Sequence, residues 1–251
     1  MGNALPEDSL SVQFADACIA CIAQCVTETD VQHLVATILR HFEFESYVFV
    51  VMVRDGTREH YRYLLGCDPG LCYRYFQNKW YAIDPFIDYA LRNTSPVLTA
   101  DVPNKSAGQK RMRQDAEANG FRNGIAVPAH GSSSSLVGVL YFGTNAGPDH
   151  ARRSLDKHRN LMRALALELL EWWNARLCTN GMLEFNLDRL HIDLLCMARD
   201  LATTNEAAAK LGLTPFCAKK RYATLNRRLG VPSKRHAVEK AIEFGLITPA
   251  A

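Results

Sequence analysis

Three stretches of the sequence combine residue types and spacings that could support chemistry. Cys18, Cys21 and Cys25 fall on one stripe of a predicted helix, where thiolates can bind a metal ion or change redox state. The carboxylate of Asp84 follows a segment rich in aromatic residues and could accept a hydrogen bond from a small molecule. Five Lys and Arg residues between positions 219 and 228 could contact the phosphates of a nucleic acid.

The cysteine stripe has a simpler interpretation than a metal site. The spacing is C-x2-C-x3-C, but no Cys/His cluster elsewhere in the sequence supplies a fourth ligand. Cysteine also packs well as a small core residue, so we expect Cys18, Cys21 and Cys25 to lie in the core, with metal binding as the alternative. Cys67 and Cys72 flank a predicted helix, a position that would suit oxidation sensing.

No arrangement of side chains in the sequence matches a catalytic site. Ser132–Ser135 lacks the G-x-S-x-G spacing of a nucleophile elbow and is expected to be a hairpin tip. The eight His residues are scattered, without an H-E-x-x-H motif. We therefore expect no enzymatic activity, no metal and no cofactor, with a redox switch built on the cysteines as the alternative.

The composition is that of an ordinary globular protein. The chain has 251 residues, of which 48% are hydrophobic and 22% charged. Its longest strongly apolar run, Tyr47–Val53, is far shorter than the roughly 18 residues that a membrane-spanning helix needs. The first residues lack the basic and apolar regions of a secretory signal. We expect a cytoplasmic protein with no membrane contact and with its eight cysteines reduced.

Charge is distributed unevenly along the chain. Residues 185–251 carry 11 Lys and Arg against 6 Asp and Glu, whereas residues 1–184 carry 18 against 20. The net charge of +3 therefore originates in the last quarter of the chain. Such asymmetry indicates contact with a nucleic acid at that end.

The hydrophobic pattern predicts two kinds of domain. Helices are expected in residues 8–41, with Thr29 or Asp30 as the cap of the second, and the long stretch Asp149–Leu177 is also expected to be helical. The expected strands are residues 46–53, 59–65, 124–130 and 135–142. The fold class is α+β, with an N-terminal α/β/α sandwich around a central antiparallel sheet and a C-terminal all-α domain of four helices.

The C-terminal helices have the pattern of a helix-turn-helix. The four expected helices are Leu187–Arg199, Asn205–Leu211, Pro215–Leu229 and Lys234–Phe244. Thr204 is expected to cap the short second helix, and a three-residue turn separates it from the longer, basic third helix. Such a unit can place the third helix in the major groove of DNA.

This segment resembles the C-terminal domain of LuxR-type transcription regulators. The matching residues are Leu211, Gly212, Leu229-Gly230-Val231, Arg235, Ala237, Ala241 and Gly245-Leu246-Ile247. Departures include Leu201-Ala202 in place of Gly-Lys and Cys217-Ala218 in place of Thr-Val. The resemblance implies a homodimer on double-stranded DNA. The DNA contacts are expected from Thr214, Lys219, Lys220, Arg221, Arg227, Arg228 and Lys234.

The N-terminal part resembles the autoinducer-binding domain of the same family. Tyr75, Asp84 and Pro85 are retained, and GFRNGIAVP matches a family motif through Gly120, Gly124 and Pro128. The resemblance implies a pocket for an acyl-homoserine lactone, in which Asp84 accepts the amide N–H of the ligand. The expected pocket residues are Tyr63, Cys67, Leu71, Tyr75, Asp84, Thr99 and Tyr141.

The pocket departs from the family at three positions. Leu71 replaces a Trp whose indole donates to the lactone carbonyl, Cys67-Asp68 replaces Tyr-Pro, and Thr99 replaces a second Trp. A missing donor that leaves a buried acceptor unpaired costs about 1–3 kcal/mol. We therefore expect either a non-standard small-molecule signal with an N–H or O–H group for Asp84, or folding without a ligand.

The combined interpretation is a ligand-responsive transcription regulator of LuxR type. Residues 1–176 form the ligand-binding domain, 177–186 a linker and 187–251 the DNA-binding domain. One alternative is a ligand-independent DNA-binding member. Another is an antiactivator that forms heterodimers with a related LuxR-type protein.

Overall fold

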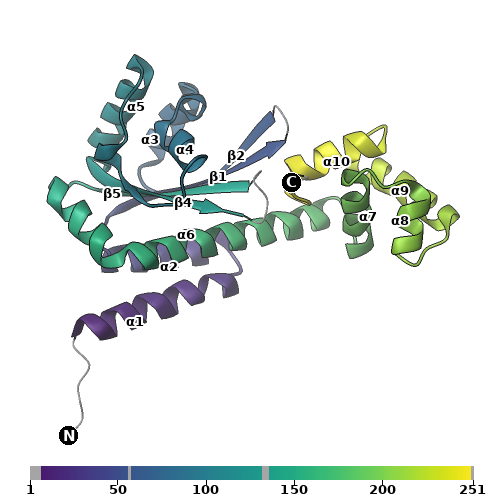
Figure 1. The fold of residues 1–251 in the computed structure, drawn as a ribbon, viewed down its shortest axis with the longest axis horizontal. Helices are drawn as coiled ribbons and strands as arrows, with labels where there is room; N and C mark the ends of the chain where they lie inside the picture. The colour runs from purple at the N-terminus through teal and green to yellow at the C-terminus, as the bar shows by residue number, and fades with distance from the viewer. Residues whose placement is uncertain (1–6, 56–57, 132–135, 250–251) are drawn as a thin grey trace, which may run out of the picture. The chain divides into compact units, whose positions relative to one another are not determined.

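The structure of the protein is a computed structural model that describes residues 7–55, 58–131 and 136–249 (Figure 1). The chain forms two compact units, the first made mainly of residues up to 171 and the second mainly of residues from 172 onward. The predicted hairpin tip Ser132–Ser135 lies outside the described residues.

The first unit has a five-stranded sheet with helices on both faces. Its strands are β1 (Ser46–Asp55), β2 (Arg58–Gly66), β3 (Val97–Leu98), β4 (Asn123–His130) and β5 (Leu136–Thr144). Its helices are α1 (Glu7–Ala20), α2 (Glu28–His41), α3 (Pro69–Gln77), α4 (Pro85–Ala90), α5 (Ala107–Ala118) and α6 (Pro148–Glu184). Figure 1 shows α3, α4 and α5 on one face of the sheet and α2 and α6 on the other, with α1 against α2. The predicted α/β/α sandwich is confirmed.

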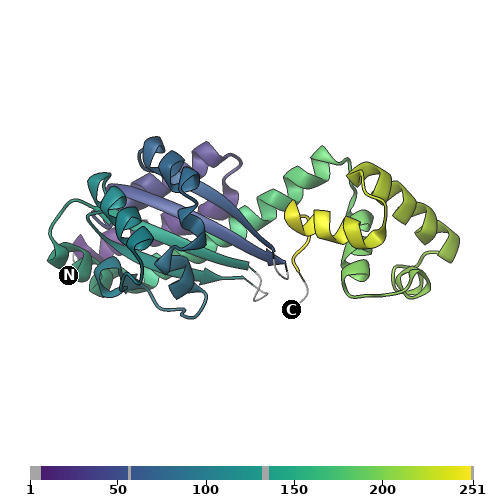
Figure 2. The same cartoon turned by 90° about the horizontal axis from the view of Figure 1, so that it is seen from above.

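The sheet has the strand order β2-β1-β5-β4-β3, and Figure 2 shows its strands side by side. β5 is buried along its whole length because helices cover both faces. Tyr141 on β5 pairs with Ala126 on β4, and both β5–β4 and β4–β3 are antiparallel. The sequence predicted four of the five strands. β3 was missed because two residues are too short to show an alternating pattern, and it pairs with β4 only at Ile125 and Ala126.

The cap of α2 corrects one expectation. Thr27, not Thr29 or Asp30, precedes the helix, and its hydroxyl accepts a hydrogen bond from the backbone N–H of Asp30. The Asp30 carboxylate accepts one in return from the backbone N–H of Thr27. This reciprocal capping box satisfies two free donors at once, so it outcompetes a single cap further along. The same arrangement caps the helix that begins at Thr204, with Thr203 as the capping residue.

The cysteine stripe does not belong to the core. Cys21 is exposed, and Cys18 and Cys25 are half-buried. The reason is that α1 ends at Ala20, so the stripe is not continued on one helix. Ile22, in contrast, is fully buried.

The second unit contains four short helices after the end of α6. They are α7 (Arg189–Arg199), α8 (Thr204–Lys210), α9 (Pro215–Leu229) and α10 (Lys234–Glu243). Residues 177–184 of the predicted linker are helical, because α6 continues to Glu184. The domain boundaries themselves stay a prediction. Leu194, Ala207 and Tyr222 form a core in this unit, and the Tyr222 hydroxyl donates to the Leu194 carbonyl at 3.0 Å.

The junction between α7 and α8 contains a strained residue. Leu201 has φ +60°, in the left-handed region that a side chain disfavours. The backbone N–H of Ala202 donates to the Met197 carbonyl, which closes the end of α7 in a way that usually takes glycine. The Leu201 side chain is 90% exposed, so it gains little from packing. In the family that this segment resembles, Gly stands at the position of Leu201.

We expect Leu201→Gly to stabilise the helical unit by about 0.5–1 kcal/mol, since relief of left-handed strain exceeds the entropy that glycine adds to the unfolded chain. Urea denaturation of the full chain, followed by circular dichroism, measures this change. The matched control is Leu183→Gly, an exposed leucine within α6, which should lose up to about 1 kcal/mol. A loss of stability in both variants would contradict the claim that the backbone of Leu201 is strained.

Candidate functional site

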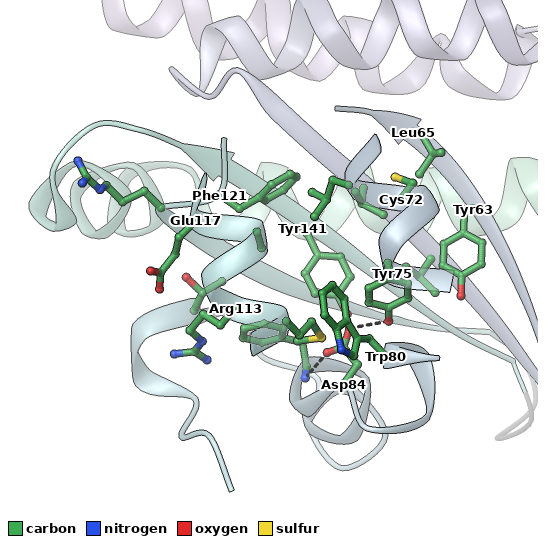
Figure 3. A pocket seen from close by; sticks show the side chains of 18 of the residues that line it. Tyr63, Leu65, Cys72, Tyr75, Trp80, Asp84, Arg113, Glu117, Phe121 and Tyr141 are labelled. Carbon is green, nitrogen blue, oxygen red and sulfur yellow. Dashed lines mark hydrogen bonds between the residues drawn. The ribbon is translucent and has the colours of Figure 1, made fainter. Parts of the chain in front are cut away.

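A cavity of about 380 Å³ lies in the first unit, between the sheet and the helices α3, α4 and α5 (Figure 3). Six of the seven predicted pocket residues line it. They are Tyr63, Leu71, Tyr75, Asp84, Thr99 and Tyr141. The seventh, Cys67, is not among the lining residues; its Sγ lies 3.6 Å from the Sγ of Cys72, which does line the cavity.

Asp84 is the most constrained side chain in the cavity. It is the N-cap of α4, and its Oδ1 accepts a hydrogen bond of 2.8 Å from the backbone N–H of Phe86. Pro85 follows at the first helical position, where its missing N–H costs nothing. The second oxygen, Oδ2, accepts from the Tyr75 hydroxyl at 2.8 Å and from the Tyr141 hydroxyl at 3.4 Å. The carboxylate is therefore held from α3, α4 and β5 together.

The buried carboxylate changes the acid–base behaviour of the site. Burial raises the pKa of Asp84, although the hydrogen bonds from Tyr75 and from the backbone of Phe86 act to lower it. Burial also raises the pKa of Tyr75 and Tyr141, and the nearby Asp84 charge adds to the effect. Both hydroxyls therefore stay protonated and keep donating to the carboxylate.

Several cavity residues were not predicted. Trp80 is only 9% exposed, and its ring lies 6.4 Å from that of Tyr75. Its position between Tyr75 and Asp84 in the sequence was a signal that could have identified it. Phe86 packs edge-on against Tyr141, with ring centroids 5.6 Å apart. Such a lining offers a large apolar surface with few polar groups, the usual character of a small-molecule site.

Arg113 adds a cation to the cavity wall. Its guanidinium carbon lies 5.3 Å from the centre of the Phe86 ring, and its Nη2 donates to the Val102 carbonyl at 2.7 Å. Burial lowers the pKa of Arg113, while the charges of Glu117 and Asp84 act in the opposite direction. No residue spacing in the sequence pointed to Arg113, because it lies on the polar helix α5 among other charged residues.

Side-chain contacts connect α3, α5 and the start of α4 at the cavity. The Arg74 side chain on α3 forms an ion pair of 2.9 Å with Asp115 on α5. The Gln109 side chain on α5 donates to the carbonyl of Ile83, next to Asp84, at 2.8 Å. These contacts fix the two helices and the start of α4 as one wall of the cavity.

Two other kinds of site receive no support from the described part of the chain. No group of three or more His, Cys, Asp or Glu in it could hold a metal ion. No helix in it has the length and apolarity to span a membrane.

The second candidate site is the solvent face of α9. Of the seven predicted DNA contacts, Lys219, Lys220 and Arg227 are exposed on this helix, and so is Arg228, which also has a partner within the helical unit. Thr214 is the N-cap, and its hydroxyl accepts from the backbone N–H of Cys217. Phe216, which was not predicted, is 76% exposed beside these residues.

The other three predicted DNA contacts have partners within the helical unit. Arg221 forms an ion pair of 2.7 Å with Asp188, the N-cap of α7. Arg228 donates to the carbonyl of Asn186 at 2.5 Å. Lys234 donates to the Thr204 hydroxyl at 2.5 Å and lies 4.0 Å from the centre of the Tyr222 ring. These cations fasten α9 and α10 to the rest of the unit.

The ion pair of Arg221 also affects Asp188. Desolvation acts to raise the pKa of Asp188, but the hydrogen bonds from Arg221 and from the backbone of His191 lower it to about 2. Asp188 therefore remains ionised at any ordinary pH and holds the guanidinium in place.

Comparison with known proteins identifies a family model and a relative that match this chain. Residues 27–171 match the family model of the autoinducer-binding domain, a range that spans more than half of the chain. The transcriptional activator protein VanR of Vibrio anguillarum is 21% identical over 178 residues, which cover 70% of this chain and 73% of VanR.

Solved structures share the fold. SdiA of Escherichia coli superposes with a TM-score of 0.64 at 17% identity, covering 94% of this chain and 98% of SdiA. SdiA in complex with octanoyl-rac-glycerol gives 0.61 at 16% identity, covering 99% and 100%. CepR2 of Burkholderia cenocepacia, described as an N-acylhomoserine lactone dependent LuxR family transcription factor, gives 0.55 at 18%, covering 65% and 98%.

The buried carboxylate predicts an unusual pH dependence of stability. Because the folded pKa of Asp84 is raised, its stabilising contribution is complete below the unfolded pKa of about 4 and is lost as pH rises through the folded pKa. Asp84→Asn keeps an oxygen for the Phe86 N–H and removes the charge. We expect its free energy of unfolding to rise relative to the original protein from pH about 4 upward, by at most about 1.4 kcal/mol per pH unit.

Asp88→Asn is the matched control, measured by urea denaturation at the same pH values. The hydrogen bond from Arg92 lowers the pKa of Asp88, so its stabilising contribution is present above the unfolded pKa and lost as pH falls. The Asp88 variant should therefore change in the opposite direction. If the free energy of unfolding changes with pH in the same way in the Asp84 variant and the original protein, the claim that Asp84 has a raised pKa is contradicted.

Proposed function

The chain belongs to the autoinducer-binding-domain family, and from that membership we propose that it is a ligand-responsive, DNA-binding transcription regulator of LuxR type. The observation that carries the DNA-binding part is the solvent face of α9, where Lys219, Lys220 and Arg227 are exposed. The observation that carries the ligand-binding part is the buried Asp84 carboxylate in a cavity with several aromatic residues in its wall.

The helical unit suits a reader of double-stranded DNA. α8 and α9 are joined by a short turn, and the Arg221–Asp188 ion pair ties α9 to α7. A helix held in this way can present its outer face to the major groove. We propose that Lys219, Lys220 and Arg227 contact DNA directly. Arg221, Arg228 and Lys234 position α9 and the helix after it, and Thr214 fixes the start of α9.

The proposed DNA-binding surface of α9 is compatible with two kinds of protein partner. A homodimer would double the cationic surface and set the spacing of two half-sites on DNA. The alternative, an antiactivator that pairs with a related LuxR-type protein, is favoured by the exposed Phe216 at the start of α9, where an apolar ring adds nothing to phosphate binding. A cytoplasmic location remains our expectation.

The cavity suits an amphipathic ligand with a hydrogen-bond donor. Asp84 offers a carboxylate that can accept from an N–H or O–H group. The hydroxyl of Tyr63 is buried without a hydrogen-bond partner among the described residues, so it is available for an acceptor on the ligand. The side chain of Leu71 has no N–H that could donate to a lactone carbonyl. We propose a ligand with an apolar chain and a hydroxyl or amide head, a class that includes the octanoyl-rac-glycerol bound by SdiA.

We expect Lys219→Ala and Lys220→Ala to weaken DNA binding without loss of stability. Each lost phosphate contact should reduce the slope of log affinity against log salt by about 1. Fluorescence anisotropy with a labelled duplex between roughly 50 and 200 mM salt measures this slope. The comparison variant is Arg221→Ala, which should lose up to about 1 kcal/mol of stability with its surface ion pair.

A flat salt response of the original protein would contradict direct DNA binding and favour the antiactivator. Equal effects of the Lys219, Lys220 and Arg221 variants on stability would contradict the division of the cations into contacting and positioning groups.

We expect Leu71→Trp to create lactone binding. Leu71 lines the cavity, and an indole N–H there could donate to the lactone carbonyl, which should raise the affinity for N-octanoyl homoserine lactone about tenfold. Isothermal titration measures the affinity, with octanoylglycerol as a second compound. Leu71→Phe is the matched control, because it adds aromatic surface without a donor. A gain in the Phe variant equal to that in the Trp variant, or tight lactone binding by the original protein, would contradict the role given to Leu71.

A further inference from the structure

Two thiols occupy the positions that normally hold an apolar contact at the start of a helix. Asp68 is the N-cap of α3, and its carboxylate accepts from the backbone N–H of Leu71. Cys67 directly precedes the cap, and Cys72 is the fourth residue of the helix. Side chains at these two positions pack together in the hydrophobic staple that fixes the direction of the incoming chain.

The cap of α7 shows the ordinary form of this arrangement. There the N-cap is Asp188, and the two corresponding positions hold Leu187 and Ile192, both buried aliphatic residues. At α3 the same geometry brings the Sγ atoms of Cys67 and Cys72 to 3.6 Å, which is van der Waals contact for two sulfur atoms. A disulfide requires about 2.05 Å, so a further approach of about 1.5 Å would join them.

We propose that Cys67 and Cys72 form a site of reversible oxidation, in which a hydroperoxide converts the thiol pair into an intramolecular disulfide that covalently fixes the start of α3. The inference rests on the proposed function only in its consequence for ligand binding. The disulfide itself needs no ligand.

The two thiols differ in their readiness to react. The hydrogen bond from Cys67 lowers the pKa of Cys72, against the effect of burial. The same hydrogen bond, together with burial, raises the pKa of Cys67. Burial raises the pKa of four other cysteines, which are Cys18, Cys25, Cys178 and Cys196. The thiolate is the nucleophile in thiol oxidation, so within this pair we expect a peroxide to oxidise Cys72 first.

The reaction balances without a further reagent. The Cys72 thiolate attacks one oxygen of the hydroperoxide, the O–O bond breaks, and the other oxygen leaves as an alcohol or as water after it takes up a proton. The resulting Cys72 sulfenic acid is attacked by the Cys67 sulfur, which forms the S–S bond and releases water. Two thiols and one hydroperoxide thus give one disulfide, one alcohol or water, and one further water. An external dithiol reverses the change.

Oxidation at this position would act on the cavity. Cys72 lines the cavity, and the following turn of α3 carries Tyr75, whose hydroxyl is bonded to Asp84. Drawing Cys72 toward Cys67 pulls the first turn of α3 toward the end of β2. The wall formed by Leu71 and Tyr75 then shifts relative to Asp84, so the oxidised protein should bind cavity ligands more weakly.

The sequence makes the disulfide simple to detect. Cleavage after Arg62 and Arg74 releases a single tryptic peptide, Tyr63–Arg74, which contains Cys67 and Cys72 and no other cysteine. The full chain is treated with hydrogen peroxide, its remaining thiols are alkylated under denaturing conditions, and the peptides are weighed by mass spectrometry. We expect this peptide to lose two hydrogen masses and to escape alkylation, and dithiothreitol to restore it. Recovery of the peptide with both thiols alkylated, while other cysteines are oxidised, would overturn the proposal.

Two single variants test the order of the steps. In Cys67→Ser the sulfenic acid on Cys72 has no thiol to condense with, so dimedone should label Cys72. In Cys72→Ser the remaining Cys67 should stay unlabelled at the same peroxide dose. Cys178→Ser is the control that keeps the pair intact and should behave as the original protein. Equal labelling of Cys67 and Cys72 would overturn the assignment of Cys72 as the reacting thiol.

The effect on the cavity is measured with the amphipathic fluorophore 1-anilinonaphthalene-8-sulfonate as the probe. We expect peroxide to lower the affinity of the original protein for the probe several-fold and to leave the Cys67→Ser variant unchanged. Unchanged affinity in a protein whose disulfide has formed would overturn the regulatory role. If no amphipathic ligand stabilises the reduced protein, the proposed function fails while the disulfide result stands, so the two failures are distinguishable.

Discussion

A charged carboxyl group cannot be buried without partners, and the first unit is organised around that constraint at Asp84. Its two oxygens receive hydrogen bonds from the Phe86 backbone, from Tyr75 and from Tyr141. These donors come from α3, α4 and β5, so the carboxylate can be satisfied only when all three elements are in place. An unpaired buried charge would cost several kcal/mol. The group that we propose to select a ligand thus also holds the cavity in shape, and a ligand bound to it would have to share the carboxylate with these internal donors.

In the helical unit, the constraint is the accommodation of the many positive charges of α9. α9 carries many cations. If all of these side chains faced the neighbouring helices, their charges would be buried without enough acceptors. Arg221 and Arg228 instead reach acceptors at the start of α7 and before it, while Lys219 and Lys220 stay in solvent. The desolvated aromatic ring of Tyr222 provides a further place for a cation, since Lys234 lies over its face. Arg221 and Arg228 are thus bonded within the unit, although Arg228 is also exposed, whereas Lys219 and Lys220 remain available for a partner.

The amino-acid sequence was sufficient for the fold class because the fold class depends on local signals, whereas the six cavity residues were obtained from the resemblance to the autoinducer-binding domain. Alternation and helical periodicity located four strands and every helix of the second unit. Features that depend on side-chain reach could not be obtained in this way. Arg221 and Lys219 are indistinguishable in sequence, although one is bonded to Asp188. Cys67 was expected in the cavity, but the turn at Asp68 directs it toward Cys72. Capping was misplaced by one to three residues because the reciprocal pairs, Thr27 with Asp30 and Thr203 with Glu206, are stronger than a single capping residue.

The short β3 strand has a consequence for the rim of the sheet. It pairs with β4 only at Ile125 and Ala126, so the later residues of β4 have no strand beside them on that side within the described chain. An uncovered strand of apolar residues would be a template on which another chain can add, but residues 124–129 of β4 are buried. Pro128 stands in this stretch, and a proline has no N–H to offer to an incoming strand. The His130 side chain also bonds the carbonyl of Asn93 across the same margin. Burial of β4, the missing N–H of Pro128 and the His130 contact thus act together to protect this apolar edge against self-association.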